Sequence, residues 1–239
     1  MALPDSFLQH LRDKGYHPRS NKHSDALAEA IVHDLVSLCP PIAERSAAGQ
    51  LVYDLNFRLV YDNSEWNTDL AIGIPPPATA PPDDGPIRRT PPSTIQIAIE
   101  LKSVMTEHRK AVKNRKRDFE AHHKHVHNYS NSAIAGGVMV VNASPTFRSP
   151  LRPEVTIHRN VGSLVAHCIR EMRNVSMRTS PSSDGLDAKA AVVVTVDNVA
   201  WPTAAYVTSA PAPAVGDPMH YDAFIQRLCA EYTVRFAAG

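Results

Sequence analysis

Glu100 and Lys102, two positions apart at the end of an apolar segment, are the side chains of this sequence best suited to chemistry. The segment Ile95–Lys102 alternates with the two-residue period of a β-strand, so one of its faces is apolar. The other face carries Gln96, Ala98, Glu100 and Lys102. A carboxylate and an ammonium group held side by side can bind a divalent cation and neutralise charge beside a phosphate. The alternative is a surface Glu–Lys pair, which the tripeptide by itself favours.

A second acid lies in a predicted hairpin that precedes this pair. The segments Leu51–Leu59 and Trp66–Ile72 both alternate with a period of two, and turn-forming residues at 61–64 join them. In the second segment, Asp69 lies on the face opposite the apolar one. Asp69 is thus an acid on the second strand of the hairpin, which precedes the strand of Glu100 in the chain.

Helices and further strands should flank these elements within one α/β domain. Apolar stripes at helical spacing predict helices over Ser24–Leu38, Glu107–Asn128, Val161–Met172 and Tyr221–Phe236. Continuous apolar runs predict buried strands over Ala133–Asn142 and Ala190–Val196. The expected fold class is α/β, a central mixed β-sheet flanked by helices, in a single domain over residues 1–239. Two proline-rich stretches, near 73–93 and 200–218, are expected to be loop insertions, because proline disfavours central strands.

The helix that follows Lys102 carries most of the positive charge of the chain. Between Lys102 and His127 there are eight Lys or Arg residues and three acids, whereas the net charge of the whole chain is +1. Six basic side chains of this helix are candidate DNA-binding residues: Arg109, Lys110, Lys113, Lys116, Arg117 and Lys124. Lys/Arg contacts to phosphates dominate DNA affinity, so this helix is typical of a phosphate-facing surface. The alternative is a solvated basic helix with no ligand.

The order of these elements resembles the PD-(D/E)XK nuclease superfamily, in particular the type II restriction endonucleases. The matching residues are Asp69 in Asn67-Thr68-Asp69-Leu70, and Glu100-Leu101-Lys102. The resemblance covers roughly residues 24–142, and Thr68 stands where the family often has proline.

The resemblance implies a restriction-endonuclease-like core with a metal site. Asp69, Glu100 and the carbonyl of Leu101 would bind Mg²⁺, for which Mn²⁺ could substitute, because oxygen ligands suit both ions. Lys102 would orient or help deprotonate the attacking water and neutralise developing charge. An acid from the first helix often joins such sites. The candidates are Glu29 and Glu44, each of which has the alternative of being an ordinary solvated acid.

The implied function is a Mg²⁺-dependent endonuclease that hydrolyses double-stranded DNA, as a restriction enzyme of a defence system does. Because two copies are needed to cut both strands of a palindrome, we expect a homodimer. One alternative is a DNA-binding module that keeps the fold without turnover. Another is a nuclease that acts on RNA or on modified DNA.

A zinc-dependent hydrolase built on the histidines of the basic helix is a further alternative. These are His122, His123, His125 and His127. They lack a His-Glu-x-x-His motif and a nearby cysteine, so packing or phosphate contacts are expected instead. Elsewhere, His33 and His108 would either assist proton transfer or be bystanders.

The cysteines and the N-terminal residues bear on the compartment. Cys39, Cys168 and Cys229 are odd in number and widely spaced, which predicts free thiols in a reducing compartment. The first twelve residues lack the pattern of a signal peptide, and no apolar run is long enough to span a bilayer. We therefore expect a soluble cytoplasmic protein.

Overall fold

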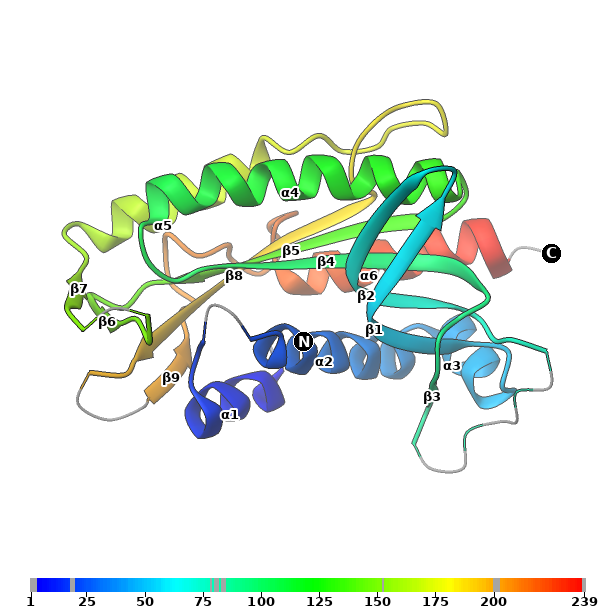
Figure 1. The fold of residues 1–239 in the computed structure, drawn as a ribbon, viewed down its shortest axis with the longest axis horizontal. Coiled ribbons are helices and arrows are strands. Elements are labelled where there is room, and N and C mark those ends of the chain that lie inside the picture. The colour runs from blue at the N-terminus through cyan, green and yellow to red at the C-terminus, as the bar shows by residue number, and fades with distance from the viewer. Residues whose placement is uncertain are drawn as a thin grey trace.

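A seven-stranded mixed β-sheet with helices on both faces forms the centre of the protein, as the predicted α/β class requires (Figure 1). The computed structural model describes residues 4–17, 20–77, 79, 82, 85–151, 153–199 and 203–237. The strand order is β3-β1-β2-β4-β5-β8-β9, and β6 and β7 form a separate two-stranded sheet. Strands β4, β5 and β8 are parallel, whereas β2 runs antiparallel to both β1 and β4.

The elements follow the predicted order along the chain. The helices are α1 (Asp5–Lys14), α2 (Lys22–Leu38), α3 (Pro40–Ala47), α4 (His108–Tyr129), α5 (Val161–Arg173), α6 (Tyr221–Tyr232) and the π-helix η1 (Thr233–Ala237). The strands are β1 (Val52–Tyr61), β2 (Ser64–Ile74), β3 (Arg88–Arg89), β4 (Thr94–Val104), β5 (Ile134–Asn142), β6 (Thr146–Arg148), β7 (Val155–Ile157), β8 (Ala188–Asp197) and β9 (Thr203–Tyr206). Among the described helices, none is by itself long and apolar enough to cross a membrane, and α2 with α3 reaches that length and hydropathy only as a pair bent by 100°.

Two apolar clusters, one on each face of the sheet, hold the helices in place. On one face α4 packs through Val112, Phe119 and Val126, which are seven residues apart and fully buried. Helix α5 covers the same face beside α4. On the other face the sheet packs against α1, α2 and α6, through residues such as Ile31 and Phe224. The candidate site lies on the face that α4 covers.

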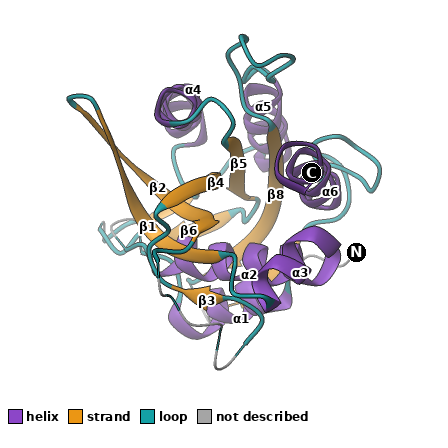
Figure 2. Cartoon of the chain, turned by 90° about the vertical axis from the view of Figure 1, so that its right-hand side faces the viewer, coloured by secondary structure: helices purple, strands orange, loops and turns teal. Residues whose placement is uncertain are grey.

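The hairpin of β1 and β2 bends away from the sheet at Asn56. This residue has a positive φ of 54°, a conformation that asparagine tolerates better than most residues. The side chain of Asn56 donates to Asp25 (2.8 Å) and accepts from Asn21 (2.7 Å), both at the start of α2. Beyond the bend the hairpin projects from the sheet (Figure 2). The ring of Trp66, near its tip, stacks on His125 of α4 with 4.7 Å between ring centroids.

A bulge in β4 changes the predicted alternation of that strand. Ile72 pairs with Ile97, but Gly73 pairs with Ile95, so Gln96 is the extra residue. Ile95 therefore joins the apolar cluster under α4, while Gln96 accepts a hydrogen bond from Tyr232 of α6. The prediction that Ile95 faces the same way as Ile97 was wrong. A Cβ on Gly73 would lie 1.9 Å from the carbonyl oxygen of Thr94, which explains why glycine stands at the bulge.

The two proline-rich stretches are not loops throughout. The first, 73–93, contains the end of β2 and the short edge strand β3, which pairs in parallel with β1. The second, 200–218, contains β9, an edge strand antiparallel to β8. Both strands lie at sheet edges, where proline nearby is tolerated. Residues 78, 80, 81, 83, 84 and 200–202 of these stretches lie outside the described residues.

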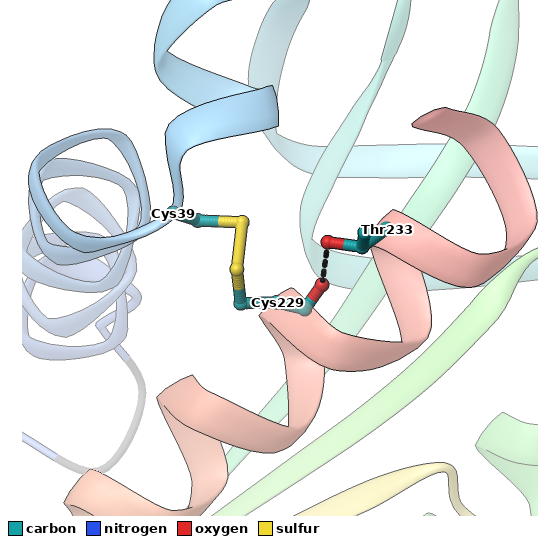
Figure 3. Close-up of a disulfide and its surroundings, with 3 residues drawn as sticks. All are labelled: Cys39, Cys229 and Thr233. Carbon is teal, nitrogen blue, oxygen red and sulfur yellow. Dashed lines mark hydrogen bonds between the residues drawn. A yellow bond between two sulfur atoms is a disulfide. The ribbon is translucent and has the colours of Figure 1, made fainter. Parts of the chain in front are cut away.

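Cys39 and Cys229 form a disulfide, which corrects the expectation of free thiols (Figure 3). The two residues are 190 positions apart in sequence, but their Cα atoms lie 5.5 Å apart. The link joins the junction of α2 and α3 to α6. Cys168 is free and buried. Sequence spacing does not reveal this pair, because only the packing of α6 beside α2 and α3 brings the two thiols together.

Candidate active site

The candidate site forms where β2 separates from β4. The last paired residues of the two strands are Leu70 and Ile99. Beyond this pair, the hydrogen bonds between the two strands are made by side chains of β2 and the backbone of β4. The backbone N–H of Leu101 donates to Oδ2 of Asp69 at 2.7 Å, and Oγ1 of Thr68 donates to the carbonyl of Ile99 at 3.0 Å. Asp69 is thus fixed at the edge of β4 by a backbone hydrogen bond.

Lys102 joins the two carboxylates. Its Nζ lies 3.1 Å from Oδ2 of Asp69 and also contacts Oε1 of Glu100. The side chain of Glu100 is only 2% exposed, whereas those of Asp69 and Lys102 are 15% and 20% exposed. The three residues expected to be catalytic therefore meet at one point, with Glu100 inside and the other two at the surface opening.

Burial and charge shift the ionisation of Glu100 and Lys102. Burial of the carboxyl group, reinforced by the nearby Asp69, raises the pKa of Glu100 to about 8. Burial alone would lower the pKa of Lys102, but the two carboxylates outweigh it and hold that pKa above its ordinary value. Lys102 is therefore an ammonium ion at neutral pH, and it supplies the charge that keeps two acids together in a buried place.

His122 of α4 faces Glu100 from the interior. Its Nε2 lies 3.3 Å from the carbonyl of Ala98 and so carries the hydrogen, which leaves a lone pair on Nδ1. Burial lowers the pKa of His122 to about 3, so the ring is neutral. Nδ1 lies 3.6 Å from Oε2 of Glu100, and both atoms are buried with no hydrogen-bond partner among the residues that the structure describes. Two electron-rich atoms facing each other in this way favour a cation or a proton between or beside them.

The arrangement fits a divalent cation through its oxygen atoms. Asp69 and Glu100 present carboxylate oxygens to a common point that the ammonium of Lys102 contacts, and Oε2 of Glu100 has no partner. The carbonyl of Leu101 points to the same strand edge as its N–H, toward Asp69. Carboxylate and carbonyl oxygens are ligands that Mg²⁺ accepts. Within the described ranges, no three His, Cys, Asp or Glu side chains are already gathered as a metal site.

The two candidate acids from the first helices lie away from this point. Glu29 is exposed on α2 and forms an ion pair with Arg89 at 3.4 Å. Glu44 is exposed on α3. Helix α2 packs on the face of the sheet opposite α4, so the structure does not bring either acid to Asp69 and Glu100. The structure agrees with the alternative that both are solvated acids, because the site opens on the α4 face.

Neither additional histidine reaches the three charged groups. His33 is largely exposed on α2, beside Asp34. His108 begins α4, and its Nε2 is bonded to the carbonyl of Asn142 at 2.7 Å. On α4, His122 and His123 are buried, His125 stacks on the hairpin, and His127 lies 3.1 Å from Oδ2 of Asp187.

The basic residues of α4 are divided between two flanks of the helix. Lys110 borders a pocket of about 230 Å³, which begins at Ser103, the residue after Lys102, and is also lined by Asn114 and Arg115. Arg109 and Lys113 instead line a groove on the side of α5. The basic helix is therefore not one continuous phosphate-facing surface.

The remaining basic residues of α4 have different surroundings. Lys116 is partly buried and forms an ion pair with Glu120 at 3.8 Å. Arg117 and Lys124 are exposed. Of these three residues, only Arg117 and Lys124 are exposed enough to add positive charge to one of the two flanks.

Two residues of the site escaped sequence reasoning, although each left a signal. Thr68 supports β4 at the point of separation, and its place beside Asp69 is where the family pattern departs from proline. His122 lies three residues after Phe119 and four before Val126, which is the spacing of the buried stripe. A histidine at that spacing predicts a ring buried against the strand that carries Glu100.

Comparison with protein-family models, with curated proteins and with solved structures found no match to this sequence. The geometry of Asp69, Glu100 and Lys102 is therefore the basis for assigning a function.

Proposed function

We propose that the protein is a Mg²⁺-dependent endonuclease that hydrolyses phosphodiester bonds of double-stranded DNA. The observation that supports this proposal is the convergence of two carboxylates and one ammonium group where β2 leaves β4. The same residues carry the resemblance to the PD-(D/E)XK nucleases. The pocket that Ser103 borders has Lys110 on its wall as a cation for a phosphate backbone, while Arg115 on the same wall is paired with Asp118 at 2.9 Å and Glu107 also lines the pocket.

Each residue has a distinct role in this proposal. Asp69, Glu100 and the carbonyl of Leu101 would hold the metal ion, which supplies charge neutralisation and an acidified water when bound. Lys102 orients the attacking water and neutralises charge that develops on the phosphate. His122 lies beside Glu100 on the interior side, where its Nδ1 faces Oε2 of that acid, and Thr68 keeps the edge of β4 in register.

A cleavage assay with conservative variants tests the proposal. Supercoiled plasmid and genomic DNA are incubated with Mg²⁺, Mn²⁺ or Ca²⁺ and with the wild type, Lys102→Ala, Glu100→Gln or Asp69→Asn. We expect cleavage by the wild type and a loss of at least about 100-fold in each variant, the scale at which removal of one charged catalytic group acts. Lys22→Ala, an exposed change on the opposite face, should cleave like the wild type. If the wild type cuts none of these substrates with any of the metals, the proposal is wrong.

A DNA-binding module without turnover is the second candidate, because the ammonium of Lys102 already contacts both carboxylates. Its signature would be DNA binding by the wild type with no cleavage under any metal condition. RNA and base-modified DNA in parallel reactions would identify a nuclease of different substrate class.

We further propose a restriction-type role in defence, with a homodimer as the active form. Sequencing the ends of cut genomic DNA tests it, since discrete ends indicate site-specific cutting and random ends indicate degradation. The mass of the protein on DNA, measured by light scattering, distinguishes one copy from two.

A further inference from the structure

A groove between α4 and α5 concentrates positive charge away from the candidate active site. It has a volume of about 440 Å³ and is lined by Arg109, Lys113, Ser163, Ala166, His167 and Arg170. No carboxylate is among the described residues that line it. In the same part of the structure, Lys116 pairs with Glu120 and Nδ1 of His167 lies 4.0 Å from Glu171, and no ion pair of the described residues involves the three Lys/Arg groups of the groove. Three cations on two facing helices are thus left without acidic partners.

Another basic pocket of the protein shows what a satisfied set of arginines looks like. It has a volume of about 670 Å³ and contains Arg178, Arg227 and Arg235. Arg178 donates to the carbonyl oxygens of Asn131 (2.9 Å) and Pro181 (2.6 Å), while Arg227 and Arg235 both pair with Glu231. The groove between α4 and α5 lacks such partners, so its charge remains available to an external anion.

The groove and the active site lie on opposite flanks of α4. His122 and Arg115 belong to the flank toward the strands of the site, as their contacts with Ala98 and with the pocket at Ser103 show. Arg109 and Lys113 belong to the flank toward α5. An α-helix with its side chains is roughly 10–12 Å across, so a ligand held in the groove is separate from one at Lys102.

We propose that the groove between α4 and α5 binds backbone phosphates of a nucleic acid outside the segment that is cleaved. Arg109 and Lys113 on one wall and Arg170 on the other match the repeated negative charge of a duplex, about one per 1.7 Å of axis. Ser163 adds a hydroxyl group, and Arg170 donates to Nδ1 of His167 at 2.9 Å, which holds the guanidinium at the rim. The choice of nucleic acid as the ligand rests on the proposed function, whereas the anion-binding character rests on the groove alone.

The test measures DNA binding by fluorescence anisotropy in EDTA, so cleavage plays no part in it. The groove variant is Arg109→Gln/Lys113→Gln/Arg170→Gln. Its control, Lys14→Gln/Lys22→Gln/Arg227→Gln, removes the same charge from exposed positions of helices on the opposite face. Labelled duplexes of about 12 and about 30 base pairs are titrated over a range of salt concentrations.

On the longer duplex, we expect the groove variant to lower the slope of log affinity against log salt by about 2 to 3, since each phosphate contact contributes about 0.9. The control should change the slope by less than about 1. Equal slopes for the wild type and the groove variant, or equal losses for both triple variants, would overturn the proposal. Pyrophosphate binding at the groove without any change in the DNA slope would instead assign it to a free phosphate compound and also overturn it. If Lys102→Ala loses cutting but keeps the wild-type slope of log affinity against log salt, the groove binds DNA independently of the active site, and the groove proposal stands.

Discussion

Reduction of the Cys39–Cys229 disulfide should destabilise the protein strongly. The bond closes a loop with a sequence separation of 190 residues, in a chain of 239. In the chain-entropy treatment, closing a loop of this length restricts the unfolded state by about 5 kcal/mol at 25 °C. For a chain of this size, such a loss corresponds to a fall of about 10–20 °C in the midpoint of thermal unfolding.

Urea unfolding of the wild type, with and without a thiol reductant, measures this contribution. The Cys229→Ser variant provides the control, because reductant has no bond to break in it and should leave its transition unchanged. Cys168 is already free, so reduction does not act there. A wild-type transition that moves by less than about 1 kcal/mol on reduction would refute the reasoning, because the cross-link would then not restrict the unfolded chain.

Three further changes test other parts of the structure. Burial alone would raise the pKa of Asp187, but its hydrogen bonds outweigh burial and lower that pKa. The ionised side chain therefore stabilises the folded protein above the ordinary pKa of an aspartate, and this contribution is lost as the pH falls through the lowered pKa. Acid-unfolding curves should therefore be shallower for Asp187→Asn, which should also cost about 3 kcal/mol at pH 7 in urea melts. Asn56→Ala should cost about 1–2 kcal/mol, whereas Asn56→Gly should cost less, because only the former strains a positive φ. Gly73→Ala should abolish native folding by circular dichroism, since its Cβ meets the Thr94 carbonyl, and Gly162→Ala, in open space on α5, should not.

The sheet and the central charged residues were predictable because period-two alternation reports which strands are buried on one side. The alternation placed Asp69, Glu100 and Lys102 on polar strand faces, and the family resemblance was needed to predict that the two strands lie together. Two local features were outside that reasoning. Asn56 has a positive φ and Gln96 is a bulge residue, and each shifts the side chains that follow to the other face. Pattern counting assumes an uninterrupted pleat, so it placed Ile95 on the wrong face.

Features that depend on packing between distant segments could not be predicted from spacing. The disulfide requires α6 to lie beside the end of α2, and neither cysteine has a sequence signal for the other. The distance of Glu29 and Glu44 from the site has the same origin, because the topology of the whole sheet determines which face a helix covers. The division of the basic residues of α4 likewise depends on where α5 packs.

The bent hairpin of β1 and β2 forms an arm whose length can change without a change in the sheet. Its outer part, beyond Asn56, leaves the sheet and rests on α4 near the tip, where Trp66 stacks on His125 and Tyr61 is hydrogen-bonded to the same ring at 2.8 Å. Changes of length at the exposed turn residues Asp62 and Asn63 would therefore alter the reach of the arm while the buried pleats stay as they are. Length changes at this tip are therefore compatible with the strands that hold Asp69, Glu100 and Lys102.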